Sequence, residues 1–109
     1  CAVCHRPDGK GAGPIKPLDG AAVVGVSSRG AGGSWRMANR HKTVLEDSFD
    51  FGFAVDWMRK DLSLAIEEAR ANGATLPTTA MIDQFYADVQ AMGGGRQDTS
   101  AIIRRIAKR

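Results

Sequence analysis

Apolar residues between positions 54 and 73 recur at the spacing of one face of an α-helix. The apolar positions that share this face are Met58, Leu62, Ala65 and Ala69. Intervals of three and four residues place side chains on one side of a helix. Gly73 can adopt a positive φ without a Cβ clash, so we expect it to end the helix. The pattern predicts a long amphipathic helix with Lys60 and Asp61 beside each other at its middle.

Two shorter helices are predicted before the central one. The first runs over about residues 19–29, with Asp19 as its N-cap and Gly30 as its stop. Ser34 can cap a second helix that begins at the next residue. A loop over residues 46–53 then leads into the central helix.

Two more helices are predicted after it. Pro77 suits the first turn of a helix, because its missing N–H has no intrahelical partner there. The triple glycine at 93–95 ends this helix, and Asp98 is a good N-cap for a last one. The residues expected to be buried are Met81, Phe85, Val89 and Met92 on the first of these helices, and Ile102, Ile103 and Ile106 on the second.

No segment alternates between apolar and polar positions for long enough to predict a strand. The predicted fold class is therefore all-α, a small bundle of about five helices with short loops and no internal repeat. Residues 1–17 differ from the rest, because three prolines and three glycines oppose a regular helix there. We expect an irregular N-terminal arm over 1–17 and a helical domain over 18–109.

Composition limits the possible partners. A chain of 109 residues has room for one small domain, and 43% hydrophobic with 25% charged residues is ordinary for a globular protein. No apolar run approaches the roughly 20 residues of a membrane span, and no signal peptide is evident, so we expect a cytoplasmic protein. The net charge of +3 lies largely near the C-terminus, without a basic stripe interleaved with aromatics. We therefore expect no nucleic-acid partner.

Only two of the five predicted helices are long, so the predicted core is thin. Small domains bury proportionately less of their surface than large ones. We therefore expect exposed apolar helix faces, and with them a homodimer or a partner subunit.

The first five residues, Cys1-Ala2-Val3-Cys4-His5, form a Cys-x-x-Cys-His motif. In such a motif the two thiols can form thioethers to haem vinyl groups while the histidine is an axial ligand. The arm resembles the haem segment of small c-type cytochromes, so haem at Cys1, Cys4 and His5 is one alternative. A metal or disulfide role, or an arm with none of these roles, are the others. The four methionines fall in helical patterns, where core packing explains them better than haem ligation.

The second histidine, His41, lies between Arg40 and Lys42. We expect it to be solvated or to lie near a helix end. No Ser/His/Asp arrangement, paired acidic site or zinc quartet is evident elsewhere in the sequence.

A series of short motifs follows in a fixed order over about residues 18–106. They are Gly33-Ser34-Trp35 with Asn39, then Phe49, Gly52-Phe53, Lys60-Asp61-Leu62 with Leu64-Ala65, Gly73 with Leu76-Pro77, and residues 94–98 with Ser100-Ala101. In order and spacing, this segment resembles the C-terminal helical domain of the β-hydroxyacid dehydrogenases. That family contains 3-hydroxyisobutyrate dehydrogenase and tartronate semialdehyde reductase. The resemblance implies a fold like the C-terminal domain of 6-phosphogluconate dehydrogenase.

The resemblance also implies roles for particular residues. In that family an N-terminal Rossmann domain holds NAD or NADP, and the helical domain closes over the nicotinamide and mediates oligomerisation. By this resemblance Lys60 contacts the cofactor, while Phe53 and Asp61 line the cleft. A lysine ammonium is a compact donor that can contact a cofactor or substrate oxygen. The structural alternative is a solvated Lys–Asp pair on an exposed helix face.

The chain also departs from the family pattern. No Gly-x-Gly-x-x-Gly motif follows a strand, and in the nearest candidate Pro14 occupies the position of the last glycine. The family's proton-transferring lysine belongs to a helix upstream of Leu18. We therefore expect no catalytic residue here and no NAD(P) bound by this chain alone. The predicted function is that of a detached or truncated cleft-closing domain, with a small electron carrier as the alternative.

Overall fold

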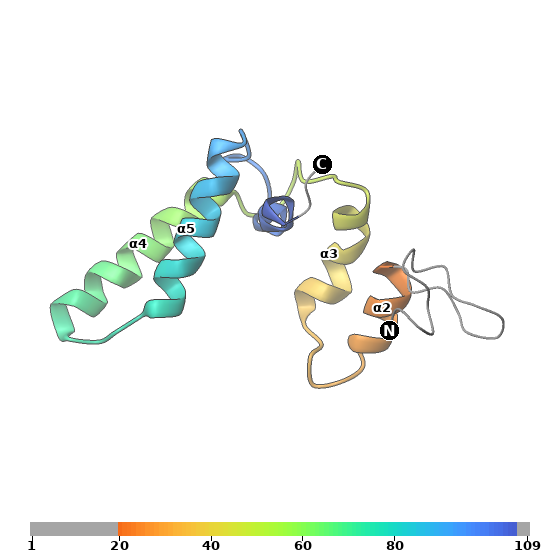
Figure 1. Cartoon of the computed structure of the whole chain (residues 1–109), viewed down its shortest axis with the longest axis horizontal. Helices are drawn as coiled ribbons and strands as arrows, with labels where there is room; N and C mark the ends of the chain where they lie inside the picture. Colours follow the sequence, from red (N-terminus) through yellow and green to blue (C-terminus); the bar gives the residue numbers. More distant parts are fainter. Residues whose placement is uncertain (1–19, 107–109) are drawn as a thin grey trace. The chain divides into compact units, whose positions relative to one another are not determined.

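The computed structural model describes residues 20–106, with side chains from residue 23. The chain divides into two compact units, Cys1–Asp47 and Ser48–Arg109. The described part of the first unit holds two helices and that of the second holds three (Figure 1). In chain order they are α2 (Gly20–Ser27), α3 (Trp35–Leu45), α4 (Val55–Asn72), α5 (Pro77–Ala91) and the 3₁₀-helix η1 (Thr99–Arg105).

The prediction of an all-α fold is confirmed. No strand occurs within residues 20–106, where the only strand-like pairing is an isolated bridge between Ala54 and Asp98. None of the helices in this part of the chain is long and apolar enough to cross a membrane.

The two helices of the first unit pack on each other. Ser34 is the N-cap of α3 as predicted, since its Oγ accepts a hydrogen bond from the Met37 amide at 3.1 Å. Helix α2 ends at Ser27, before the predicted stop at Gly30, while Asp19 lies outside the described residues. No residue of α3 is buried within this structure.

Helices α4 and α5 form an antiparallel pair joined by a short loop (Figure 1). Gly73 ends α4 with a φ of 80°, the left-handed conformation that a residue with a Cβ adopts only under strain. Pro77 is the first residue of α5. Both predicted helix boundaries are therefore confirmed.

Three of the four residues expected on the packed face of α4 are covered, since Met58 and Leu62 are half-buried and Ala69 is buried. Val55 and Ala69 are buried and Ile66 is half-buried, whereas Ala65 is exposed. The assignment of Ala65 to the packed face was wrong. Since only one neighbouring helix covers α4 along its length, its contact is a narrow stripe, and a shift of one residue rotates a side chain by about 100°.

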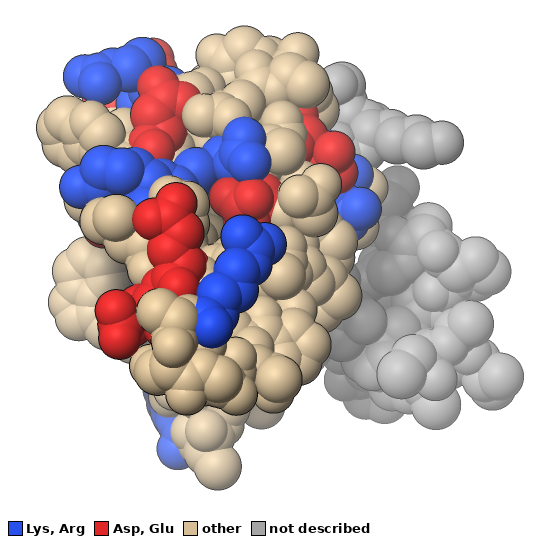
Figure 2. Space-filling model, turned by 90° about the vertical axis from the view of Figure 1, so that its left-hand side faces the viewer, with Lys and Arg blue, Asp and Glu red and all other residues tan. Residues whose placement is uncertain are grey.

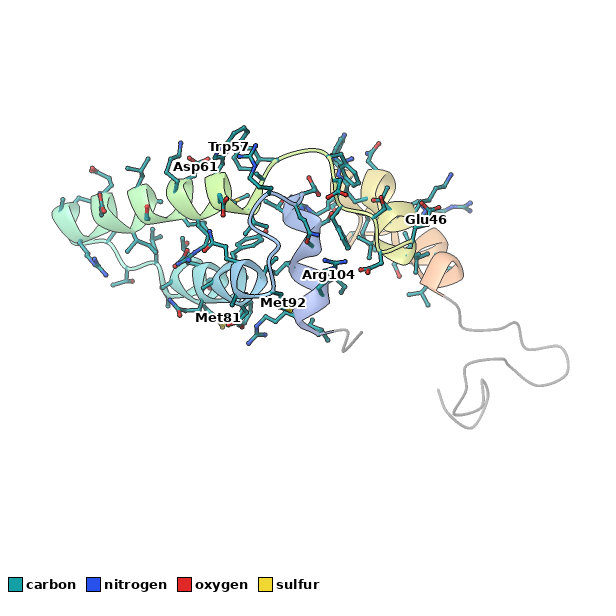
Figure 3. All side chains as sticks on the ribbon, turned by 90° about the horizontal axis from the view of Figure 1, so that it is seen from above. Glu46, Trp57, Asp61, Met81, Met92 and Arg104 are labelled. Atoms are coloured by element: carbon teal, nitrogen blue, oxygen red, sulfur yellow. The ribbon has the colours of Figure 1, made fainter. Side chains whose placement is uncertain are left out.

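The same reason explains two errors on α5. Tyr86 and Val89 are buried, with Ile82 half-buried one turn earlier, while Met81 and Met92 are 50% and 51% exposed. Figure 3 places both methionines on the side of α5 that faces away from α4. Core packing, predicted for all four methionines, therefore does not account for these two.

A polar network joins the first half of α4 to α5. The Arg59 guanidinium donates to both carboxylate oxygens of Asp83 at 2.8 and 2.9 Å and to Gln90 Oε1 at 2.6 Å. Gln90 in turn donates from Nε2 to Asp56 Oδ1 at 2.5 Å. The hydrogen bond from Arg59 lowers the pKa of Asp83, and the same bond raises the pKa of Arg59.

The lowered pKa of Asp83 predicts a pH-dependent contribution to stability. Replacing Asp83 with asparagine should lower the free energy of unfolding at pH 7 by about 1 kcal/mol, the size expected of a partly exposed bidentate pair. A group with a depressed folded-state pKa stabilises above its unfolded pKa, 3.8 here, and loses this effect as the pH falls through the folded value. Urea unfolding followed by circular dichroism checks this. The curves of the two proteins should converge in acid, and a difference that stays constant below pH 3.8 would contradict the assignment.

The core of the second unit lies where the loop before α4, the end of α5 and η1 meet. Its largest fully buried side chains are Phe49, Val55, Val89 and Thr99. Asp98 caps η1 as predicted, accepting a hydrogen bond from the Ser100 amide at 3.0 Å.

The buried face of the last helix differs from the prediction. Ile103 and Ile106 are exposed, and the buried residues are Thr99, Ser100 and Ala101. The segment is a short 3₁₀-helix, whose three-residue turn does not keep the spacing assumed for an α-helix. Of the three isoleucines, Ile102 alone is half-buried.

Candidate functional site

Lys60 and Asp61 lie side by side on α4, and Lys60 Nζ is 3.0 Å from Asp61 Oδ1. Their side chains are 65% and 49% exposed, so the pair faces solvent in this structure. Figure 3 shows Asp61 and Trp57 on the side of α4 that faces away from α5. The predicted juxtaposition of Lys60 and Asp61 is therefore present on an open helix face.

Phe53 lies in the loop just before α4, at the same end as Trp57. The two ring centroids are 6.0 Å apart and the ring planes are tilted by 58°. Both side chains are exposed. The pair forms an aromatic surface one turn of helix from the Lys60–Asp61 pair, because residues three and four apart are neighbours on a helix. We call Phe53, Trp57, Lys60 and Asp61 the outer face of α4.

Asp98 holds the backbone of the Phe53 loop. Its carboxylate is buried, accepting hydrogen bonds from the Phe53 amide at 3.1 Å and from Ser100 Oγ at 2.5 Å, in addition to the cap bond. The Phe53 carbonyl accepts from the Thr99 amide at 2.9 Å, and the Asp98 amide donates to the Phe49 carbonyl at 2.8 Å. These bonds fix the position of Phe53 relative to η1.

Backbone carbonyls satisfy the first amides of α4. The N-cap residue Ala54 has no capping side chain. Instead Val55 donates to the Gln97 carbonyl and Asp56 to the Gly95 carbonyl, both at 2.9 Å. A Cβ at Gly95 would lie 2.5 Å from Asp56 Oδ1, so a side chain there would force the Asp56 carboxylate to move.

Two members of the surface around this site were not predicted from the sequence. Trp57 precedes Asp61 by four residues, so helical spacing alone could have placed it on the same face. Arg96 places its guanidinium carbon 5.3 Å from the Trp57 ring centroid. No local signal could have found this contact, because it joins residues far apart in the chain.

Other candidate features lie elsewhere. His41 is half-buried within α3, where Nδ1 donates to the Met37 carbonyl at 2.8 Å, rather than solvated or in the last helical turn as expected. An open pocket of about 350 Å³ lies at the α4–α5 turn, lined by residues that include Ile66, Leu76 and Arg70, and it does not include the outer face. Among the described residues no group of three or more His, Cys, Asp or Glu side chains could hold a metal ion.

Comparison with known proteins decides the family. The family model described as "NAD-binding of NADP-dependent 3-hydroxyisobutyrate dehydrogenase" matches residues 15–106. The chain belongs to this family. The match confirms the resemblance drawn from the sequence, and it includes every residue of the outer face.

Three longer proteins are similar in sequence to this member of the 3-hydroxyisobutyrate dehydrogenase family. An uncharacterized oxidoreductase of Shewanella frigidimarina is 56% identical over 91 residues, which are 84% of this chain and 31% of that protein. The 2-(hydroxymethyl)glutarate dehydrogenase of Eubacterium barkeri is 40% identical over 83% of this chain and 29% of that enzyme. The L-threonate dehydrogenase of Escherichia coli K12 is 32% identical over 81% of this chain and 28% of that enzyme. This chain thus spans about a third of the length of the relatives it matches.

The haem prediction at Cys1, Cys4 and His5 has no support from these comparisons. The three residues lie outside the described residues and outside the family match, which begins at residue 15.

Proposed function

We propose that the second unit forms the helical side of an NAD(P) cleft in an oxidoreductase of the 3-hydroxyisobutyrate dehydrogenase type. The observation that carries the proposal is the family match, which includes Lys60 and Asp61. Both side chains are accessible to solvent. In this proposal Lys60 contacts the cofactor, and Phe53 and Asp61 line the cleft. The same proposal assigns the helical domain to residues 18–109 and the protein to the cytoplasm.

The outer face suits these roles chemically. NAD(P) supplies the hydride acceptor or donor of such a reaction. Lys60 offers three donors on a flexible stem, and Asp61 holds its ammonium at 3.0 Å beside the aromatic pair. Phe53 and Trp57 present exposed ring surface against which a flat nicotinamide can pack. None of these side chains is placed to transfer a proton in this proposal, so no catalytic residue is assigned to the chain.

The chain is proposed to act as a cleft-closing and oligomerisation domain, binding no NAD(P) by itself. A homodimer is part of the proposal because large apolar side chains are exposed in both units. Those more than half exposed are Val26, Trp35, Leu64, Met92 and Ile106. Exposed apolar surface of this kind is typical of protein interfaces.

Lys60 provides the test. NADPH is titrated against the full chain, alone and mixed with the Shewanella frigidimarina relative shortened to end before its matching segment. We expect binding in the mixture to exceed the baseline of the shortened relative, and Lys60→Gln to weaken it about tenfold, the size of one charge-assisted hydrogen bond. Calorimetry measures the affinity, and light scattering of the same samples should report a dimer.

The matched control is Arg70→Gln, which removes one exposed positive charge from the far end of α4. This variant should bind as the parent does. If Lys60→Gln has no effect in either sample, the proposed role of Lys60 is wrong. A monomer at high concentration would remove the homodimer from the proposal.

A further inference from the structure

The outer face of α4 carries a second cation that the family resemblance does not assign. Arg96 comes from the loop between α5 and η1, and its guanidinium carbon lies 5.3 Å from the Trp57 ring centroid. Lys60 follows Trp57 by three positions and is therefore its neighbour on the helix surface. Arg96 therefore lies over the Trp57 ring, and Lys60 follows one helical turn after the same residue.

The charges of these two side chains are balanced differently. Lys60 already has Asp61 Oδ1 at 3.0 Å. Arg96 is exposed, and none of the carboxylates in the described part of the chain forms an ion pair with it. Arg105, by comparison, lies over Phe85 at 3.9 Å and also pairs with Asp88. Arg96 is therefore a stacked guanidinium whose charge is not matched by this part of the chain.

The contact between Arg96 and Trp57 leaves hydrogen-bonding capacity unused. A guanidinium is planar and carries five N–H donors in its plane, while cation–π attraction to an indole acts through the ring face. These donors match the geometry of a carboxylate or phosphate, which can accept two parallel hydrogen bonds. A ligand on this face can therefore use the donors of Arg96 without displacing the guanidinium from Trp57.

The backbone of Arg96 is also held in place. The carbonyls on either side of it, those of Gly95 and Gln97, accept the Asp56 and Val55 amides at 2.9 Å. Gly95 lies against the Asp56 side chain, whose Oδ1 would be 2.5 Å from a Cβ at this position. A side chain projecting from a fixed backbone loses less conformational entropy on binding than one on a free loop.

We propose that Arg96, supported by Trp57, is an oxyanion-binding residue of the outer face. Its ligand is a phosphate or carboxylate group. That these two groups are considered rests on the proposed function, in which both a dinucleotide and a hydroxy acid bind. The phosphate belongs to the dinucleotide, and the carboxylate to a hydroxy acid. The competing interpretation is that Arg96 only shields Trp57 from water. It predicts no change in anion binding when the guanidinium is removed.

Anion titration of the full chain tests the assignment. The ¹⁵N-labelled chain is titrated with inorganic pyrophosphate in one arm and L-threonate in the other, against sodium chloride at matched ionic strength. The indole N–H signal of Trp57 is followed, with Trp35→Phe to identify it. We expect a saturable shift with at least one anion, and Arg96→Gln should weaken that binding about tenfold. Arg96→Lys should restore only part of it, because lysine keeps the charge without the planar fork.

Arg70→Gln is again the control for loss of a positive charge and should leave the affinity unchanged. A shift with pyrophosphate alone identifies the phosphate source, one with L-threonate alone identifies the carboxylate source, and shifts with both indicate a site that accepts either. Absence of a saturable shift with both anions, or equal affinity in the parent and Arg96→Gln, overturns the proposal. The amide spectrum of Arg96→Gln shows directly whether the variant has kept its fold.

The outcome is separable from that of the Lys60 experiment. Binding of NADPH that depends on Lys60 but not on Arg96, with no pyrophosphate or threonate effect, would leave the proposed function standing and remove this inference. Anion binding that depends on Arg96, combined with no effect of Lys60→Gln on NADPH, would do the reverse.

Discussion

Replacing Phe49 with alanine should remove about a third or more of the stability of the second unit. Phe49 is 2% exposed and is the largest fully buried side chain of the described residues. Truncation of a buried phenylalanine costs about 3–5 kcal/mol, and a unit of roughly 60 residues is stable by roughly 3–9 kcal/mol. We expect the urea midpoint of Phe49→Ala, followed by circular dichroism, to fall by at least about a third, or the variant to be unfolded without urea.

Two further variants make the Phe49 result specific. Phe49→Leu keeps most of the volume and should cost less than about 1.5 kcal/mol. Leu64→Ala removes an apolar side chain that is 56% exposed, so its effect should stay within about 0.5 kcal/mol. Equal losses in Phe49→Ala and Leu64→Ala would show that Phe49 is not at the centre of the core.

The second large effect is expected at Asp98. Asp98→Ala removes the acceptor of three hydrogen bonds and leaves the Phe53 and Ser100 amides without this partner. The side chain is 3% exposed, so water does not replace the carboxylate readily, and we expect a loss of about 2–4 kcal/mol. Urea unfolding gives the total, and hydrogen exchange at the Phe53 amide reports the local change.

Ser100→Ala is the comparison for Asp98. It removes the hydroxyl bond at 2.5 Å and leaves both amide bonds to Asp98, so its cost should be about 1 kcal/mol. Protection of the Phe53 amide should survive in Ser100→Ala and be lost in Asp98→Ala. If the two variants exchange at the same rate at that amide, the carboxylate does not hold the Phe53 loop.

The parts of the fold that were predicted from the sequence depend on local chemistry. Ser34 accepts the Met37 amide, Gly73 takes a positive φ and Pro77 begins α5, and each effect acts within a few residues. Such local effects favour a helix start or end whatever other elements pack around the helix. Helix boundaries were therefore predicted within two residues in most cases.

Burial was predicted less well, because it depends on which neighbours cover a helix. Ala65, Met81 and Ile103 all belong to apolar patterns, but each lies beside its helix's contact stripe and is exposed. A helix with one or two neighbours buries a narrower face than a pattern of apolar residues suggests. The exposed apolar residues agree with the expectation of a thin core.

The contacts of the candidate site also differ in whether the sequence could predict them. Lys60 and Asp61 are adjacent in the sequence, so their contact at 3.0 Å follows from the chain itself. The contact of Arg96 with Trp57 and the bond from the Phe53 amide to Asp98 join segments about 40 or more residues apart. Neither is encoded in a local pattern, because both depend on how the loops fold back onto α4.

The backbone capping of α4 has an evolutionary consequence. Because carbonyls at 95 and 97 accept hydrogen bonds from the first amides of the helix, residue 54 needs no capping side chain, and the buried Ala54 can serve there. An insertion or deletion in the loop between α5 and η1 would move the carbonyls of Gly95 and Gln97 away from the amides whose hydrogen bonds they accept. In homologues built on this plan, we expect the number of residues in that loop to be kept, and no preference for a capping side chain at residue 54.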